Sequence, residues 1–513
     1  MLFLIFGDYL FLVFVMSVPS SSEKSPVSPV LNEASGSESS SSLGSRVESA
    51  ALPVISEAPQ KTWRPTLSVS VIQEETGKSN ALEFEDSVGQ IIGNGSVVNY
   101  STPDSSSSDW LRDVCSFFRE LESGGSLVAV GSSDVDKNLR RGVTHTFVAR
   151  NSARENLAIV KPALGCFSSS LYKNWQKMHR QRYAIDFVDM IPRERLAFVV
   201  SEYLFSDWKE GCVKVPETHL FKLPARFFVG GPIDDLNGSD TVFCSVQQFV
   251  PLSKSLTQVP RKSFDEISPE QFRAFAVLDI LLYSTDRGRQ NALVSNGSSL
   301  VPIDHGLILS KGFIDSVVFF WIGCPACNTP FSVEEKEAIL KLDWMTLREV
   351  VLQTVPGIDS DSLYSLNATL DFLQTGVRLG LNAYQIGSLL CRGSELEIDF
   401  LRQAYLDALD LKGPSSSFSG NVKQAIEKYL IPCAGFILDP KNQELLTRRY
   451  TGYYGCEVSA IAMIVRELQV LRLHLTEALR DEGRDGSIVI FQEVFKNHLE
   501  VASLTWKSQS EKL

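Results

Sequence analysis

Residues 286–306 read DRGRQNALVSNGSSLVPIDHG and place two aspartates, Asp286 and Asp304, on either side of a short apolar segment. NALV and LVPI predict two β-strands, and the Asn-Gly pair between them is a strong hairpin signal. A hairpin returns the chain to the edge from which it started, so it brings Asp304 back beside Asp286 and Asn291. We therefore expect two carboxylates and one amide at a single site.

The spacing of these three side chains indicates phosphotransfer. Four residues separate Asp286 from Asn291, as in the catalytic loop of protein kinases, where the Asp takes up the proton of the nucleophile and the Asn binds a metal ion. Asp304 begins an Asp-x-Gly sequence at the far end of the hairpin, where kinases place their metal-binding D-F-G aspartate. Mg²⁺ prefers closely spaced hard oxygen ligands and completes its coordination with ATP phosphates. We predict that Asn291 and Asp304 bind Mg²⁺ and that Asp286 is catalytic.

The composition of the chain argues against several classes of function. The chain has 513 residues, of which 44% are hydrophobic, and a formal net charge of −12. This charge argues against nucleic-acid binding and against docking of the whole protein on anionic lipid. The nine cysteines lie mostly in apolar stretches and predict buried free thiols in a reducing compartment. The C-x-x-C of Cys324 and Cys327 has no second pair nearby in the sequence, so buried thiols are favoured over zinc.

The N-terminal part divides into two segments. Residues 1–16 are apolar, but they carry Asp8 and no basic residue before the apolar run. They predict either a secretory signal or membrane anchor, or an extension upstream of a true start at Met16. Residues 17–108 are rich in Ser, Pro and Glu and predict a disordered arm. A cytosolic or peripheral-membrane location is expected, with export through the N-terminal segment left open.

Periodic patterns from Asp109 onward predict an α+β protein. Residues 109–250 contain a helix N-capped by Asp109, strands within 126–131, 144–150, 156–162, 215–223, 225–231 and 241–250, and a helix over 192–205. Residues 251–412 are mostly helical from Ser268 onward. Residues 413–513 form a helical extension after a linker over 410–420. In the extension, an apolar stripe within 458–480 predicts packing on the main domain or a site for a partner helix; its members are Ile461, Ile464, Leu468, Leu471 and Leu475.

The motifs together resemble a known family. DILLYSTDRGRQNALV, VPIDHGLIL and FFWIGCPACNTPFSVEEKEAILKLD are similar to segments of the phosphatidylinositol 3-/4-kinase superfamily, closest to type II phosphatidylinositol 4-kinases and their plant gamma-type relatives. The resemblance covers roughly residues 140–390. It implies a bilobal protein-kinase-like fold, with a β-rich N-lobe (109–250) and an α-rich C-lobe (251–412). It also implies ATP and Mg²⁺ as co-substrate and cofactor.

Further site residues follow from this resemblance. NLAIVKP resembles the strand whose lysine grips ATP phosphates, which assigns that role to Lys161. PRERLAFVVSEYL resembles the helix whose glutamate pairs with this lysine, which is Glu194. SVQQFVP resembles the hinge, so Gln248 and Val250 are expected to set backbone groups against adenine. Arg287 is placed in the catalytic loop, where it either orients the loop, contacts phosphate or forms a local salt bridge.

The sequence is compatible with three hypotheses for the function, two of which differ in the molecule that accepts the phosphate. The first is a phosphoinositide lipid, the second is a protein, and the third is a non-catalytic module in which the kinase fold only supports interactions. Type II relatives carry a lipidated cysteine cluster, but here only Cys166 is present in that region. The basic and aromatic residues of 172–183 are suited to a lipid headgroup surface and equally to a solvated helix face. Peripheral membrane contact would therefore be local.

Overall fold

The computed structural model describes a defined part of the chain, in two units that divide between Glu75 and Thr76. The described residues are 2–6, 9–13, 97–98, 100, 107–123, 127–129, 146–163, 187–208, 211–228, 241–313, 317, 319–391, 399–410, 418–446, 449–451, 457–459 and several positions between 461 and 502. In the first unit, β1 (Leu2–Phe6) pairs antiparallel with β2 (Tyr9–Val13). The signal or anchor function of residues 1–16 stays a prediction, and most of the arm over 17–108 lies outside the described residues.

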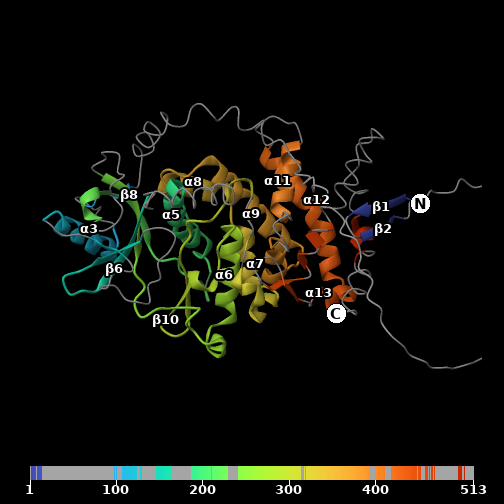
Figure 1. Cartoon of the computed structure of the whole chain (residues 1–513), viewed down its shortest axis with the longest axis horizontal. Helices are drawn as coiled ribbons and strands as arrows, with labels where there is room; N and C mark the ends of the chain where they lie inside the picture. Colours follow the sequence, from blue (N-terminus) through green and yellow to red (C-terminus); the bar gives the residue numbers. More distant parts are fainter. Residues whose placement is uncertain are drawn as a thin grey trace, which may run out of the picture. The chain divides into compact units, whose positions relative to one another are not determined.

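A six-stranded sheet opens the second unit, and Figure 1 labels its strands β6 and β8. The strand order is β3-β7-β8-β6-β5-β4. All neighbours pair antiparallel except β3 and β7, which run parallel. The bounds are β3 Val97–Val98, β4 Val128–Ala129, β5 Phe147–Arg150, β6 Asn156–Pro162, β7 Thr218–Pro224 and β8 Thr241–Gln248. β3 lies inside the range predicted to be disordered, so that prediction is wrong at its C-terminal end. Its two valines add to the sheet edge by pairing with Leu220 and Phe221.

Helix α3 (Asp109–Leu121) covers one face of this sheet. Its N-cap is Ser108, whose hydroxyl accepts a hydrogen bond from the Leu111 amide at 3.2 Å, so the predicted cap at Asp109 is wrong by one residue. Phe118 is fully buried against Phe221 and Phe227 of the sheet layer. The strand predicted over 225–231 is also wrong, because Ala225–Phe227 forms a 3₁₀ turn that carries Phe227 into this core.

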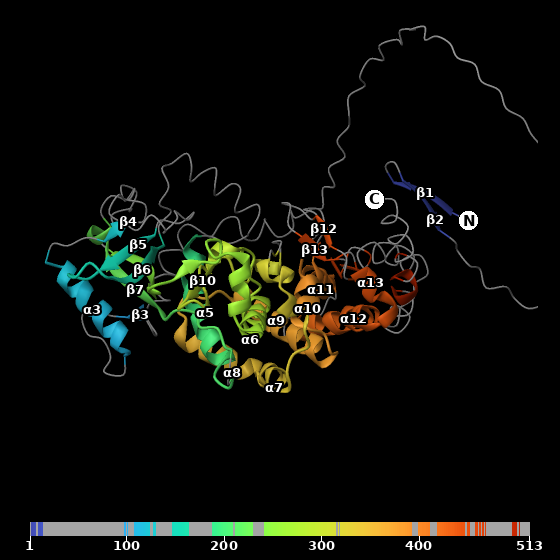
Figure 2. The ribbon, with the colours of Figure 1, turned by 90° about the horizontal axis from the view of Figure 1, so that it is seen from below.

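Helix α5 (Phe187–Leu204) joins the sheet to the helical part. It begins five residues before the predicted start and contains Pro192 in its interior. The helix contacts β7 and β8, while Leu196, Val199 and Val200 belong to the core of the helical part. One helix therefore serves both layers, and Figure 2 shows it between the sheet and α6.

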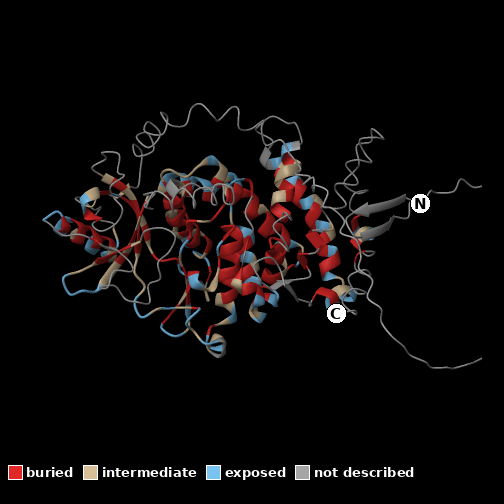
Figure 3. Ribbon diagram, viewed as in Figure 1, coloured by how far each residue is buried: buried red, intermediate tan, exposed pale blue. Residues whose placement is uncertain are grey.

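The helical part follows in the chain and has its own apolar core. Figure 3 shows α6 and α9 buried along most of their length. Ser268 caps α6 with Pro269 at its first position, and Ser332 with Glu335 forms a reciprocal capping box at α7, the arrangements that fix helix starts. The bounds are α6 Pro269–Leu281, α7 Val333–Lys341, α8 Trp344–Thr354, α9 Ser360–Arg378, α10 Ala383–Ser388, α11 Phe400–Asp410, α12 Phe418–Leu438 and α13 Gln443–Leu446.

A three-stranded sheet, β11-β10-β9, carries the predicted hairpin. The bounds are β9 Lys254–Ser255, β10 Ala292–Ser295 and β11 Ser299–Pro302. Ser295 pairs with Ser299, and the turn between them needs positive φ at Asn296 (51°) and Gly297 (82°). These are the residues that tolerate the left-handed region best, so the predicted hairpin is confirmed.

Short single-turn segments and a small ribbon connect these elements. They are η3 Arg261–Glu266, η4 Arg289–Asn291, η5 Lys311–Phe313, η6 Phe320–Gly323, η7 Pro325–Asn328, η9 Pro440–Asn442, β12 Arg449–Thr451 and β13 Glu457–Ser459.

The residues beyond 412 share the core of the helical part. Tyr429 and Leu430 of α12 are fully buried in it, as are Ile461 and Ile464. Packing on the main domain, one of the two interpretations of the apolar stripe, therefore applies to its first two members. Leu468, Leu471, Leu475 and most of the 410–420 linker lie outside the described residues. Among the helices that the structure describes, none combines the length and apolarity needed to cross a bilayer.

Candidate active site

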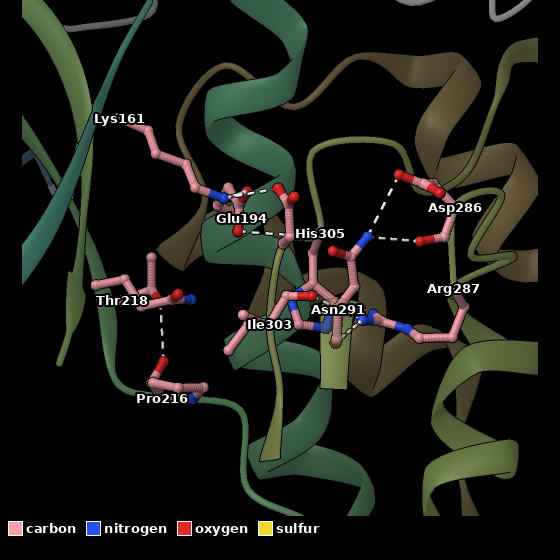
Figure 4. A network of polar contacts seen from close by, with 11 residues as sticks. Lys161, Glu194, Pro216, Thr218, Asp286, Arg287, Asn291, Ile303 and His305 are labelled. Atoms are coloured by element: carbon pink, nitrogen blue, oxygen red, sulfur yellow. Dashed lines mark hydrogen bonds and ion pairs between the residues drawn. The ribbon is translucent and has the colours of Figure 1, made fainter. Parts of the chain in front are cut away.

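Lys161 and Glu194 meet at one point (Figure 4), and Asp304 bonds to the same lysine, although the three residues come from separate elements. Lys161 lies near the end of β6, opposite Ser245 of β8, and Glu194 lies on α5. The Lys161 Nζ donates to Glu194 Oε1 at 2.5 Å and to Asp304 Oδ1 at 2.8 Å. The side chains of Lys161 and Glu194 are 12% and 3% exposed, whereas that of Asp304 is 44% exposed. One carboxylate is thus buried with the lysine and the other remains open to solvent.

Glu194 also holds the loop that carries Asp304. Its second oxygen, Oε2, accepts a hydrogen bond from the backbone amide of His305 at 3.1 Å. Asp304 itself has a φ of 60°, a left-handed conformation that costs a non-glycine residue about 1 kcal/mol. Two hydrogen bonds offset this cost, one from the Lys161 amine to the Asp304 carboxylate and one from the His305 amide to the Glu194 carboxylate. They fix the carboxylate of Asp304 in place.

Charge sets the ionisation of this cluster. Burial by itself lowers the pKa of Lys161, but the Asp304 and Glu194 carboxylates reverse this effect, so the net pKa is raised and the amine is charged. The Lys161 charge lowers the pKa of Asp304, which is therefore ionised at neutral pH. Burial lowers the pKa of His305 well below its usual range. The imidazole next to Asp304 is accordingly neutral and fully enclosed.

Asp286 and Asn291 stand on the other side of the site. The Asn291 Nδ2 donates to the Asp286 backbone carbonyl at 2.7 Å and to Asp286 Oδ2 at 3.3 Å. Because these bonds engage the amide nitrogen, they leave the Asn291 Oδ1 as the ligand atom. Figure 4 shows the Asn291 side chain between Asp286 and the Lys161–His305 side of the site. The Asp286 side chain is exposed and Asn291 is buried.

Arg287 points away from the open site. Its side chain is 1% exposed. Its Nε donates to Asp279 Oδ1 at 2.8 Å, and its Nη1 donates to the carbonyls of Asn291 and Ile303, each at 2.6 Å. The guanidinium thereby links the start of β10 to the segment just before Asp304. Of the three roles left open for Arg287, the local salt bridge is present, with Asp279 as its partner, and the bonds to the two carbonyls support orientation of the loop.

The hinge candidates lie where β8 leaves the sheet. The Gln248 amide donates to the Glu217 carbonyl at 2.7 Å, so this donor is engaged within the chain. The Val250 carbonyl accepts from the Ser253 hydroxyl at 2.8 Å. Their expected contact with adenine stays a prediction.

Sequence reasoning missed the buried support beneath the catalytic loop. Asp279 of α6 is fully buried, and burial raises its pKa while Arg287 opposes the change. Its Oδ2 accepts from the Trp321 indole Nε1 at 2.9 Å. The signal was present, because Asp279 is a single carboxylate in the apolar run AFAVLDILL. The bond from the His305 amide to Glu194 had no such signal. Cys166 and the 172–183 segment lie outside the described residues.

One segment of the chain matches a known protein family. Residues 242–386 match the family model described as phosphatidylinositol 3- and 4-kinase. The similarity to the phosphatidylinositol 3-/4-kinase superfamily thus lies in this segment, which is less than half of the chain. The matched segment contains Asp286, Asn291 and Asp304, whereas Lys161 and Glu194 lie before it.

Among curated proteins, the chain is similar to plant phosphatidylinositol 4-kinases. This chain is 30% identical over 186 residues to phosphatidylinositol 4-kinase gamma 4 of Arabidopsis thaliana. The aligned region covers 35% of this chain and 32% of that protein. The chain is 28% identical over 248 residues to the gamma 5 protein of the same plant, with 44% and 38% covered. The chain thus spans about a third of the length of these relatives. Among solved structures, a MAP kinase from Leishmania major aligns with 54% of this chain and 85% of the kinase chain, at 10% sequence identity and a TM-score of 0.20. This similarity is too low to support any conclusion about function.

Proposed function

We propose that this protein is an ATP-dependent phosphotransferase that transfers the γ-phosphate of ATP to a hydroxyl group of a phosphoinositide. The proposal is carried by a buried, charged lysine bonded to a half-exposed aspartate and by the Asp286–Asn291 pair. The Ile303 amide, next to Asp304 in the chain, ties the two groups together by donating to the Asn291 carbonyl at 3.2 Å. The printed names of the relatives supply the lipid class of the acceptor.

Lys161 would bind ATP phosphates. Its amine is charged and is held by two carboxylates, so it is positioned before nucleotide arrives. Glu194 keeps the amine at that position and ties it to the Asp304 loop through the His305 amide. A fixed cation at the phosphates stabilises charge in the transition state without reorganisation. Val250 and Gln248 would lie against adenine.

The donor atoms of Asn291 and Asp304 fit Mg²⁺. Asp304 presents an ionised carboxylate that is 44% exposed, and Asn291 presents an amide oxygen because its nitrogen is engaged by Asp286. Magnesium in nucleotide sites takes one or two carboxylates plus phosphates and water. When bound, the ion neutralises the charge that develops on the phosphates.

Asp286 would act on the acceptor hydroxyl. Its carboxylate is exposed, and the bond from Asn291 fixes its orientation. An ionised carboxylate in this place accepts the proton of the attacking hydroxyl and aligns it with the phosphorus. Arg287 is a positioning residue in this scheme, because all its described contacts are internal.

The test is one reaction that offers both acceptor classes. The full chain receives γ-labelled ATP, Mg²⁺, vesicles containing phosphatidylinositol and a generic protein, with Asp286→Asn as the control. We expect label in the lipid and a decrease of about 10²–10⁴-fold in the control, the range for loss of a general base. Label in the protein alone would replace the lipid with a protein acceptor. No label above the Asp286→Asn control would favour a non-catalytic module.

A further inference from the structure

Cys324 and Cys327 form a close pair in the connection between the hairpin and α7. Cys324 immediately precedes η7, and the Cys327 amide donates to the Cys324 carbonyl at 3.1 Å. This bond closes a four-residue turn, whose terminal Cα atoms lie within about 7 Å of each other. Disulfides need a Cα separation of about 4.4–6.8 Å. The turn thus brings the two cysteines close enough for a disulfide that requires little movement of the backbone.

The two thiols have different surroundings. Cys324 is partly exposed and lines a cavity of about 610 Å³ together with Phe264, Arg289 and Phe320. Cys327 is fully buried, and its Sγ lies 3.5 Å from the carbonyl oxygen of Phe272. A reagent in the cavity therefore reaches Cys324 first, and Cys327 stands directly behind it.

The pKa values of the two thiols differ in the same sense, because the more exposed thiol, Cys324, has the lower pKa. The neighbouring Cys327 thiol, aided by the backbone amides of Ala326 and Cys327, lowers the pKa of Cys324 to about 7 against the opposing effect of burial. Burial raises the pKa of Cys327 well above its usual range, and the charges of Arg273 and Asp279 act on it in opposite directions. Cys324 is thus the nucleophile and Cys327 the resolving thiol, an arrangement that is typical of C-x-x-C dithiols.

Metal binding is the other chemistry of such a pair. A structural zinc site takes four ligands. In the part of the chain that the structure describes, no group of three or more His, Cys, Asp or Glu side chains is arranged to hold a metal ion. The observations therefore lead to disulfide exchange.

We propose that Cys324 and Cys327 are a redox-active dithiol that closes to a disulfide by exchange with the disulfide of a small thiol, such as glutathione disulfide. The Cys324 thiolate attacks one sulfur of glutathione disulfide, and the first glutathione leaves with the proton that Cys324 has given up. The Cys327 sulfur then loses its proton and attacks Cys324 in the mixed disulfide, which releases the second glutathione. The protein loses two hydrogens and the reagent gains two.

The dithiol is linked to the support of the catalytic loop. The Cys324 amide donates to the Trp321 carbonyl at 2.8 Å, and the Trp321 indole donates to Asp279. The carboxylate of Asp279 in turn holds Arg287. Closing the disulfide breaks the hydrogen bond that the Cys327 thiol donates to the Phe272 carbonyl of α6. An effect of oxidation on phosphotransfer would rest on the proposed function, whereas disulfide formation is measured without it.

The test uses the reduced full chain in buffers of varied glutathione to glutathione disulfide ratio at pH 7. Free thiols are trapped by alkylation, and the peptide containing both cysteines is examined by mass spectrometry. We expect that peptide to lose two hydrogens, with an oxidised fraction that depends on the square of the glutathione concentration. Cys327→Ser should stop at one glutathione on Cys324, and Cys324→Ser should give neither product. Cys212→Ser, which removes another partly exposed cysteine, should leave disulfide formation unchanged.

Two results would overturn the proposal. One is a peptide that stays reduced in every buffer while glutathione disulfide modifies Cys212. The other comes from a measurement on the unmodified chain, the pH dependence of the alkylation rate of Cys324. We expect this rate to reach half its maximum near pH 7. At that pH about half of Cys324 is then thiolate, against about 3% of an ordinary thiol with a pKa of about 8.5. A half-maximum above pH 8.5 contradicts the role of Cys324 as the nucleophile.

Discussion

The Lys161–Glu194 pair allows a quantitative test of the site by a double-mutant cycle. Glu194→Gln keeps an oxygen for the His305 amide but removes the charge that faces Lys161, and Lys161→Met removes the amine at similar volume. At 2.5 Å two unit charges attract by about 7 kcal/mol for an effective dielectric constant of about 20. Desolvation offsets most of this energy. Breaking a buried pair typically costs about 3–5 kcal/mol.

The lower end of this range applies to Glu194→Gln because Asp304 remains beside Lys161. Although its carboxylate is 44% exposed and solvent weakens the attraction, it still compensates part of the Lys161 charge when Glu194 is neutralised. We therefore expect Glu194→Gln to lower the free energy of unfolding by about 3 kcal/mol, and Lys161→Met, which leaves the buried Glu194 without its cation, to lower it by about 5 kcal/mol. The coupling energy between the two substitutions should be about 2 kcal/mol.

The assay is urea-induced unfolding of the full chain, with m-values compared among the variants. The exposed pair of Lys341 and Asp207 supplies the control. The effects of Lys341→Met and Asp207→Asn should simply add, because solvent screens this exposed pair. Additivity of the Lys161 and Glu194 substitutions within about 0.5 kcal/mol would refute the argument, because it would mean that the two charges do not interact in the folded protein.

Three further predictions follow from the same contacts. Asp304 has a folded pKa below its unfolded value of about 3.9, so its stabilisation is complete above that value and is lost as pH falls through the folded pKa. The difference in unfolding free energy between the unmodified chain and Asp304→Asn should be constant from pH 8 to pH 5 and shrink below about pH 4; a difference that grows on acidification would contradict the ion pair. Arg287→Lys should cost about 2–3 kcal/mol, because lysine cannot reproduce the fork between Asp279 and two carbonyls; unfolding measurements that show no loss would mean that the fork does not support the loop. Removing residues 1–96 should leave the melting temperature unchanged, whereas removing 1–106, which deletes β3, should lower it by a few degrees; equal melting temperatures would show that β3 adds nothing to the sheet.

The sequence was most informative where local chemistry determines the backbone. Asn296-Gly297 fixes the hairpin turn, and NLAIVKP matches β6 residue for residue. The meeting of Asp286, Asn291 and Asp304 follows from that turn. It could be predicted without knowing any distant contact.

Long-range contacts set what could not be predicted. The last residues of the arm lie in a Ser-rich context, yet Val97 and Val98 pair with β7, a partner more than one hundred residues away. ARFFVGG reads as a strand, but packing of Phe227 against Phe118 favours a 3₁₀ turn. The contact between Glu194 and the His305 amide joins residues 111 positions apart. Nothing in either local sequence indicates it.

The most direct test of the central claim is the Mg²⁺ dependence of ATP binding. Isothermal titration would compare the full chain with Asp304→Asn, each with and without Mg²⁺. The account predicts that Mg²⁺ tightens binding of ATP to the unmodified chain at least tenfold, a difference of about 1.4 kcal/mol, and that Asp304→Asn removes this gain while its thermal transition persists. An equal Mg²⁺ effect in both proteins would contradict the assignment of Asp304 as a metal ligand and, with it, the proposed site.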